Sequence, residues 1–154
     1  CCLLTYGCLL RPHQEIRQLK WGDFNEDLTL ISLPGKRNKS GRNRIVPVSP
    51  FISQHLKAGE RENNIFTGTK TPHNRYYFST LWSRYKEQSN LIEDNQTLYS
   101  FRHTGAIDVF QRTGSLTKLQ QVMGHSNMTV SLGYLRNLEL PTLTMEDMPV
   151  LNHG

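Results

Sequence analysis

The chain has 154 residues, of which 36% are hydrophobic, so it is long enough for one domain with a real core. Its 18 Lys and Arg outnumber its 13 Asp and Glu, and the formal charge is +5 at pH 7. No apolar run reaches the roughly 18 residues that a membrane-spanning helix needs, which excludes that class of protein. The three cysteines lie within residues 1–8 without zinc-ligand spacing, so we expect a reducing, cytoplasmic compartment.

The positive charge is concentrated in one stretch of the chain. Between Leu28 and Gly59 there is no Asp or Glu, but there are six cations. Five of these are close together, namely Lys36, Arg37, Lys39, Arg42 and Arg44. A local basic loop is typical of a surface that binds a polyanion, most simply a nucleic acid backbone. The alternative is a solvated loop that is basic for solubility, and charge alone does not separate the two.

The first third of the chain is predicted to form two helices and a hairpin. Apolar residues at helical spacing predict a helix over residues 1–10, and Pro12, at a first-turn position, predicts a second one over 12–19. Residues that favour the pleated conformation predict strands over 28–33 and 44–48. Because Pro-Gly and Ser-Gly pairs punctuate the link between these strands, the basic cluster lies on a hairpin connection.

The middle of the chain is predicted to be helical. Ser49-Pro50 opens a short helix that ends near residues 58–59, and Thr71-Pro72 is a plausible N-cap and first residue of another. Behind Pro72 one helical face carries an apolar stripe: Tyr77, Phe78, Leu81, Trp82 and Tyr85. The simplest interpretation of this stripe is that it is part of the core.

The last third is predicted to form three helices and a tail. One helix begins near Tyr99 and is stopped by Gly114. A second runs from a Ser115 cap to Gly124, and a third begins at Ser126 or Asn127 and reaches toward residue 134. An acidic tail follows. The fold class is therefore mostly α with a small antiparallel β-sheet (α+β).

Several polar residues fall at predicted helix ends and loops, namely Arg11, Lys39, Tyr99, Arg102, His103, His125 and Tyr134. Arginine holds two phosphate oxygens in a planar fork and keeps its charge, and lysine or histidine moves protons. A tyrosine hydroxyl forms a covalent ester by attack on phosphorus. The acidic residues form no cluster suited to Mg²⁺, which argues against a two-metal nuclease. The pattern predicts a phosphate site that uses no metal.

Four segments and a tyrosine carry a resemblance to a known family. Residues 98–104 (LYSFRHT) and 123–126 (MGHS), with Tyr134 following, closely resemble box II of the tyrosine recombinases, the phage-integrase family. Residues 10–23 (LRPHQEIRQLKWGD) resemble box I, and residues 39–48 (KSGRNRIVPV) resemble the hairpin that carries the family's lysine. The resemblance covers residues 1 to about 136 and implies the family's catalytic-domain architecture there, with residues 137–154 as a C-terminal tail.

The resemblance implies a role for each matching residue. Arg11 and Arg102 would clamp the scissile phosphate, and Tyr134 would attack it to leave a 3′-phosphotyrosyl bond. Lys39 would protonate the leaving 5′-hydroxyl, with Lys36 as the rival candidate for that role. His125 would bind the phosphate and assist proton transfer. Because the bond energy is kept in the ester, no cofactor, ATP or metal is implied.

Two positions depart from the family pattern. Tyr99 stands where the family usually has His or Lys, so we expect it to donate a hydrogen bond to phosphate instead of acting as a base. Arg11 and Glu15 are four residues apart, where three is common, but both spacings lie on one helical face and allow a salt link. His103 is interpreted either as a partner of the phosphate ligands or as a structural histidine.

The resemblance also implies partners. We expect double-stranded DNA, a further DNA-binding domain upstream, several protomers assembled on DNA, and no membrane. The basic residues Lys36, Arg37, Arg42 and Arg44, with His103, are the predicted DNA contacts. The expected setting is a phage or mobile element acting at a bacterial nucleoid. Two alternatives remain open: a non-catalytic DNA-binding module on the same scaffold, and a relaxing enzyme similar to topoisomerase IB.

Overall fold

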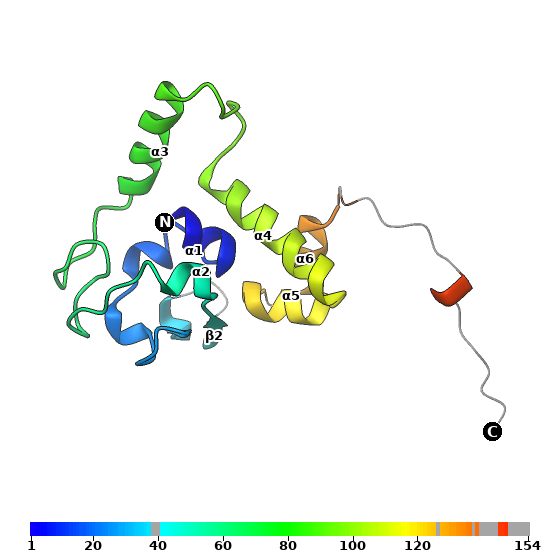
Figure 1. Cartoon of the computed structure of the whole chain (residues 1–154), viewed down its shortest axis with the longest axis horizontal. Coiled ribbons are helices and arrows are strands. Elements are labelled where there is room, and N and C mark those ends of the chain that lie inside the picture. Colours follow the sequence, from blue (N-terminus) through cyan, green and yellow to red (C-terminus); the bar gives the residue numbers. More distant parts are fainter. Residues whose placement is uncertain (38–40, 126, 137, 139–144, 148–154) are drawn as a thin grey trace.

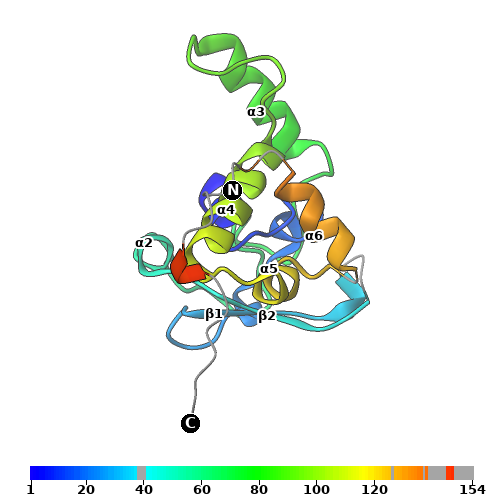
Figure 2. The same cartoon turned by 90° about the vertical axis from the view of Figure 1, so that its right-hand side faces the viewer.

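The computed structural model describes residues 1–37, 41–125, 127–136, 138 and 145–147. The chain is mostly helical with one two-stranded antiparallel sheet, as the sequence predicted. Its regular elements are α1 (Cys2–Gly7), β1 (Leu30–Leu33), β2 (Arg44–Pro47), α2 (Pro50–Ser53), α3 (Tyr77–Gln88), α4 (Leu98–Thr113), α5 (Leu116–Met123) and α6 (Met128–Tyr134). Figures 1 and 2 show the sheet and α3 at opposite ends of the molecule, with α1 between them.

The sheet buries one of its two faces. Ile31 pairs with Val46, both are fully buried, and neighbouring Leu30 and Ile45 are exposed, which is the alternation expected of a half-buried hairpin. The first strand begins two residues later than predicted. The Asn25 side chain accepts hydrogen bonds from the backbone N–H groups of residues 29 and 30, which holds the chain there in a turn.

Helix α4 crosses α1 at very close range. A Cβ atom on Gly105 would overlap the backbone of Tyr6, so only glycine permits this approach. A small buried cluster on the same side of α4 contains Leu9, Ala106, Leu119 and Met123. The α1–α4 crossing and this cluster determine where the first turns of α4 lie relative to residues 9–11.

The last three helices begin and end where the sequence predicted. The Thr97 side chain caps α4, and Gly114 ends it in the left-handed conformation at φ 62°. Ser115 caps α5, and Gly124 ends that helix at φ 66°. Asn127 caps α6, because its side-chain oxygen accepts from the N–H of residue 129 at 2.8 Å. These boundaries depend on local caps, which is why they were readable from the sequence.

The helix predicted over residues 12–19 is wrong. The backbone N–H groups of Ile16 and Arg17 reach back five residues, to the carbonyls of Arg11 and Pro12, and only a 3₁₀ turn over Ile16–Gln18 follows. The Glu15 carboxylate also accepts from the backbone N–H of Arg11 at 2.8 Å. A side chain that binds the backbone in this way competes with the regular helical ladder.

The predicted start of α3 at Thr71-Pro72 is also wrong. The Thr71 carbonyl accepts from the Thr67 hydroxyl at 2.9 Å, and the Asn74 side chain accepts from the N–H of Tyr76 at 2.9 Å. These bonds hold residues 67–76 in turns, so the helix begins only at Tyr77.

The apolar stripe of α3 is core at only one position. Phe78 is buried, whereas Leu81 is 43% exposed and Tyr85 is 52% exposed. Tyr77 and Trp82 are half-buried and border a hollow of about 540 Å³ between α3, α1 and α4.

The helix predicted after Ser49 is shorter than expected, and most of the predicted tail lies outside the described residues. The helix predicted to run from Ser49 to residues 58–59 ends at Ser53, because the N–H groups of His55 and Leu56 bond three residues back and the chain then leaves the helix. Of the predicted tail, 137–154, only Leu138 and the 3₁₀ turn Met145–Asp147 belong to the described residues. Within the described part of the chain, no helix has the length and apolarity needed to cross a membrane.

Candidate active site

Arg102 occupies the centre of the candidate site. It lies on the second turn of α4 and is 1% exposed. Its Nε donates to the Leu9 carbonyl at 2.7 Å, and its Nη2 donates to the Met123 carbonyl at 2.8 Å. These two carbonyl oxygens fix the guanidinium between the end of α5 and the segment after α1 without neutralising its charge.

The Leu9 carbonyl is presented by an unusual backbone conformation. Leu9 has φ 52°, in the left-handed region that costs a residue with a Cβ about 1–2 kcal/mol. The Leu9 side chain is 1% exposed and packs in the cluster beneath α4. Burial of that side chain therefore offsets the backbone strain, and the strain turns a carbonyl toward Arg102.

Arg11 is joined to Glu15 at the edge of the same site. Its Nη1 lies 3.1 Å from the Glu15 carboxylate, so the salt link that the four-residue spacing allowed is present. The Arg11 side chain is 14% exposed, whereas the Glu15 side chain is 1% exposed. The buried carboxylate thus holds a guanidinium that still reaches the surface.

Arg44, predicted as a DNA contact, lies inside the molecule. It is 6% exposed, its Nη2 pairs with Glu15 at 2.9 Å, and its Nη1 donates to the Met123 carbonyl at 2.8 Å. Burial lowers the pKa of Arg44, and the Glu15 carboxylate acts in the opposite direction. This burial corrects the prediction of a surface contact: Arg44 is the first residue of β2, and the inward register of that strand points it at the site.

One carbonyl therefore receives two arginines. Arg44 and Arg102 both donate to Met123 O, immediately before Gly124. A Cβ on Gly124 would overlap the Arg44 guanidinium, and its φ of 66° is itself unfavourable for other residues. Gly124 is thus required for the turn and for the approach of Arg44 to the end of α5.

His125 follows this glycine and faces the arginines. It is 9% exposed, its Nδ1 lies 3.0 Å from the Ser131 hydroxyl, and its backbone N–H donates to the Gln120 carbonyl at 3.1 Å. Burial, then the positive charges of Arg102, Arg11 and Arg44, lowers the pKa of His125 to about 4. The imidazole is therefore neutral at pH 7.

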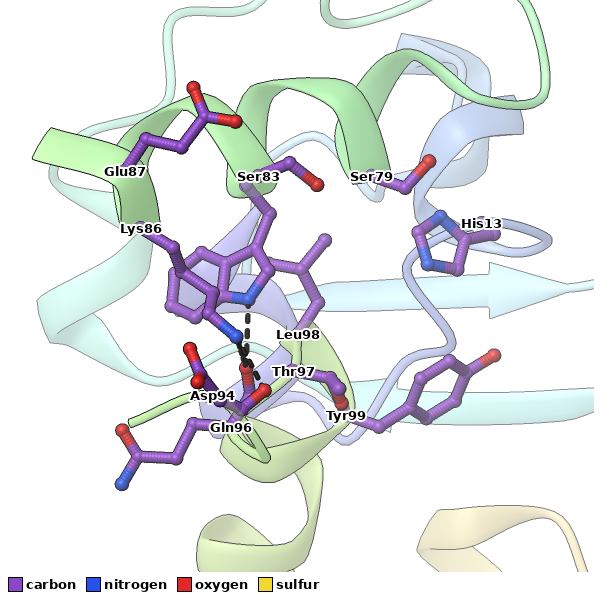
Figure 3. Close-up of a pocket in the computed structure, with 11 residues that line it drawn as sticks. His13, Ser79, Ser83, Lys86, Glu87, Asp94, Gln96, Thr97, Leu98 and Tyr99 are labelled. Atoms are coloured by element: carbon purple, nitrogen blue, oxygen red, sulfur yellow. Dashed lines mark hydrogen bonds between the residues drawn. The ribbon is translucent and has the colours of Figure 1, made fainter. Parts of the chain in front are cut away.

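Tyr99 lies one turn before Arg102 on α4 and is 38% exposed. Its ring is 5.9 Å from that of His13, measured between centroids. Figure 3 shows both rings at one end of a hollow of about 560 Å³ between α3 and the start of α4. At the other end Lys86 donates to the Asp94 carbonyl at 2.6 Å, and Trp82 donates to the Gln96 carbonyl at 3.1 Å. The hollow thus extends the site from Tyr99 toward α3.

The remaining predicted contacts are spread around the hairpin and α4. Lys36 and Arg42 are exposed, and His103 is half-buried. Arg37 is joined to the Asp23 carboxylate and donates to the Gln18 carbonyl at 3.0 Å, so its charge is already compensated inside the protein.

Two predicted catalytic residues are described incompletely or not at all. Lys39 lies outside the described residues, and of Tyr134 only the backbone, which closes α6, is described. Of the other four predicted catalytic residues, Arg11, Arg102 and His125 are brought together by the segment after α1, the start of α4 and the α5–α6 turn, and Tyr99 lies one turn before Arg102.

The sequence did not single out two residues that complete this arrangement. The role of Arg44 was hidden because its charge placed it with the exposed basic cluster. Ser131 was missed because a lone serine in a short helix carries no signal until its distance from His125 is known. Among the described residues, no group of three or more His, Cys, Asp and Glu is arranged to hold a metal ion.

The arrangement suits an anion. Arg44 and Arg102 both bind the end of α5, and Arg11 is joined to Arg44 through the Glu15 carboxylate that they share. Cations held in a buried frame favour a phosphate group more strongly than solvated ones do, because the frame does not have to reorganise when the anion binds.

Comparison with known proteins finds a matching family and related sequences. The model of the phage integrase family matches residues 1–140. Tyrosine recombinase XerA of Pyrococcus horikoshii is 26% identical over 141 residues, which cover 87% of this chain and 48% of that protein. XerA of Thermococcus onnurineus is 25% identical over 140 residues, covering 87% and 49%. The chain spans about half the length of the curated relatives it matches.

Solved structures share the fold. A crystal structure of XerA recombinase gives a TM-score of 0.69 at 16% identity, covering 85% of this chain and 50% of that one. The Tn1549 transposon integrase, in complex with transposon right end DNA, gives 0.66 at 18% identity, covering 95% and 54%. The catalytic domain of bacteriophage HP1 integrase gives 0.62 at 19% identity, covering 88% and 71%.

Proposed function

Because this chain belongs to the phage integrase family, we propose that it is the catalytic domain of a tyrosine-type site-specific DNA recombinase. Its reaction cuts and rejoins DNA through a 3′-phosphotyrosyl intermediate, without metal or ATP. The observation that carries the proposal is the convergence of Arg11, Arg44 and Arg102 next to His125, directly before the helix that ends at Tyr134.

The cleavage step exchanges one phosphodiester for another. The Tyr134 hydroxyl attacks phosphorus, the bond to the 5′ oxygen breaks, and Lys39 gives that oxygen its proton. The phenol proton passes to water, because a histidine with a pKa near 4 is a weak base at pH 7. His125 then acts as a hydrogen-bond donor to the phosphate. Rejoining is the reverse, with the 5′-hydroxyl of a partner strand as nucleophile.

The arginines supply the rate enhancement. The pentavalent transition state carries more negative charge than the diester, so fixed cations bind it more tightly than the ground state. Arg102 is held by two carbonyls and Arg11 by Glu15, so neither has to move when that charge develops. Tyr99, half-exposed in the first turn of α4, donates a hydrogen bond to the same phosphate.

DNA binding uses the exposed members of the basic cluster. Lys36 and Arg42 contact the backbone of a DNA duplex, and half-buried His103, which follows Arg102 on α4, is a further DNA contact. Arg37 supports the hairpin through Asp23, and Arg44 supports the site through Glu15. Several protomers assemble on paired DNA sites, with residues 137–154 as the contact between neighbours.

Covalent capture tests this proposal without knowledge of the DNA site. The full-length protein is incubated in excess EDTA with a library of duplexes that carry a randomised segment, and protein–DNA adducts are isolated under denaturing conditions and sequenced. We expect enrichment of one sequence class, and loss of all adducts for Tyr134→Phe. The control is Tyr85→Phe, which removes the hydroxyl of an exposed tyrosine on α3 and should keep full adduct yield.

Other outcomes identify the alternatives. Sequence-selective binding without adducts would establish a non-catalytic DNA-binding module. Adducts on every sequence, with relaxation of supercoiled plasmid but no exchange between two sites, would establish a relaxing enzyme. Adducts that persist in Tyr134→Phe would remove Tyr134 as the nucleophile.

A further inference from the structure

We propose that Ser131 is a positioning residue for His125. The Ser131 hydroxyl donates to Nδ1, so that the imidazole carries its proton on Nε2 and directs this N–H toward the scissile phosphate. The proposal rests on the proposed function for its substrate, but the orientation and tautomer of the ring are properties of the protein alone.

The contact between the two side chains is short and shielded from water. Ser131 Oγ lies 3.0 Å from His125 Nδ1, Ser131 is fully buried, and His125 is 9% exposed. A buried hydroxyl needs a hydrogen-bond partner, and this contact provides one. Because Nδ1 faces the serine, the proposal assigns the contact with the substrate to Nε2, on the other side of the ring.

The backbone of His125 is held as firmly as its ring. Its N–H donates to the Gln120 carbonyl at 3.1 Å, and its carbonyl accepts from the Gln120 side chain at 3.3 Å. With main chain and Nδ1 both bonded, rotation of the ring about its bonds is restricted. Ser131 therefore completes a three-point attachment of this residue.

The positive charges around the imidazole favour its neutral form. Arg11, Arg44 and Arg102 disfavour a fourth cation, so the neutral ring has a single N–H. A phosphate oxygen requires a donor, and a neutral ring with its proton on Nδ1 would turn a lone pair toward the anion. When the Ser131 hydroxyl donates to the unprotonated Nδ1, it stabilises the tautomer with its proton on Nε2, which is the one that the anion requires.

The same bond joins two parts of the site. Ser131 belongs to α6, whose backbone ends at Tyr134, whereas His125 belongs to the turn that follows α5. Since α6 is only seven residues long, its position depends on contacts such as this one. Loss of the hydroxyl is therefore expected to disturb the ring and the helix of the nucleophile together.

The first test measures the tautomer in the protein without DNA. Nitrogen-15 NMR of the imidazoles at pH 7 should show His125 with its proton on Nε2 in the wild type. Ser131→Thr keeps a hydroxyl and should keep this pattern. Ser131→Val has nearly the same shape without the hydroxyl and should show a mixture of tautomers. A proton on Nδ1 in the wild type, or identical spectra for the Thr and Val variants, would overturn the proposal.

The second test measures single-turnover cleavage of a duplex obtained by covalent capture. We expect Ser131→Ala and Ser131→Val to cleave at least about tenfold more slowly, with DNA affinity within about twofold of wild type, and Ser131→Thr to stay within about threefold of the wild-type rate. Equal rates for the Thr and Val variants would overturn the role of the hydroxyl. If Ser131→Ala does not fold, the cleavage rates of Ser131→Thr and Ser131→Val still test the role of the hydroxyl.

The two tests separate this proposal from the proposed function. Failure of the wild type to form any adduct counts against the recombinase activity, while the NMR comparison still decides whether Ser131 sets the tautomer. Normal adducts with an unchanged tautomer in Ser131→Val leave the recombinase proposal intact and reject Ser131.

Discussion

Two arginines two residues apart on the hairpin do different work. Arg42 is exposed just before β2 begins, and Arg44 is the first residue of that strand and is 6% exposed. Arg44 pairs with a buried carboxylate and the Met123 carbonyl, whereas Arg42 is exposed to solvent. The same side chain thus holds the site together at one position and is available to an external polyanion at the other. Charge density along a sequence does not distinguish the two arginines, because it does not show which side chain is exposed and which is buried.

The largest expected effect is on stability, in Arg44→Met. This change leaves Glu15 buried with one guanidinium fewer and removes a donor from the Met123 carbonyl. We expect the free energy of unfolding, measured by urea denaturation, to fall by about 3 kcal/mol. Arg42→Met is the matched control and should change it by less than about 0.5 kcal/mol. Similar losses in both variants would remove the distinction between the two arginines.

Gly124→Ala tests the approach of Arg44 to the end of α5. The left-handed backbone costs about 1–2 kcal/mol, and displacement of the Arg44 guanidinium raises the loss to about 3 kcal/mol. Gly114→Ala is the control, because Gly114 ends α4 at a similar φ of 62° but has open space around its Cβ position. The thermal unfolding temperature should fall further for Gly124→Ala than for Gly114→Ala. Equal decreases would show that only the backbone conformation matters.

The pH dependence of stability measures how strongly burial and the neighbouring arginines disfavour protonation of His125. Burial, then Arg102, Arg11 and Arg44, lowers the pKa of this histidine to about 4, so the unfolded chain binds the proton more readily. The contribution to stability is therefore fully present above about pH 6.5 and falls as the pH drops toward 4, by a total on the order of 3 kcal/mol.

Urea denaturation between pH 7.5 and 4 measures this loss. His125→Gln should flatten the dependence in that window. His55→Gln, which removes an exposed histidine, should leave it unchanged. A slope that survives in His125→Gln would assign the dependence to another group.

The smallest expected effect is that of replacing Arg42, the exposed arginine of the pair. Arg42→Gln should leave the free energy of unfolding unchanged and weaken binding to DNA evenly across sequences. The slope of log affinity against log salt should decrease by about one unit, because one phosphate contact is lost. Lys57→Gln, an exposed cation beyond the hairpin, is the control and should retain the wild-type slope. An unchanged slope in Arg42→Gln would place the DNA elsewhere.

Helical boundaries were predictable where local chemistry determines them. The caps at Thr97, Ser115 and Asn127 and the left-handed Gly114 and Gly124 all act within a few residues. Prediction failed over residues 12–19 and 71–76 because side chains there bind the backbone across short loops. Such bonds compete with helical ones at similar free energy, so helical spacing alone does not reveal which will form.

The candidate site was also predictable only in part. The types and order of Arg11, Arg102 and His125 were sufficient to predict a phosphate site and a family, because that chemistry requires those groups whatever the path of the chain. The sequence by itself also determined the helical character of the last third and the basic hairpin. Only the tertiary structure decided that Arg44 points inward, that the Leu9 and Met123 carbonyls hold the central arginine, and that Ser131 meets the ring of His125. Those contacts join residues from separate elements, and their geometry exists only once α1, α4, α5 and the sheet have packed together.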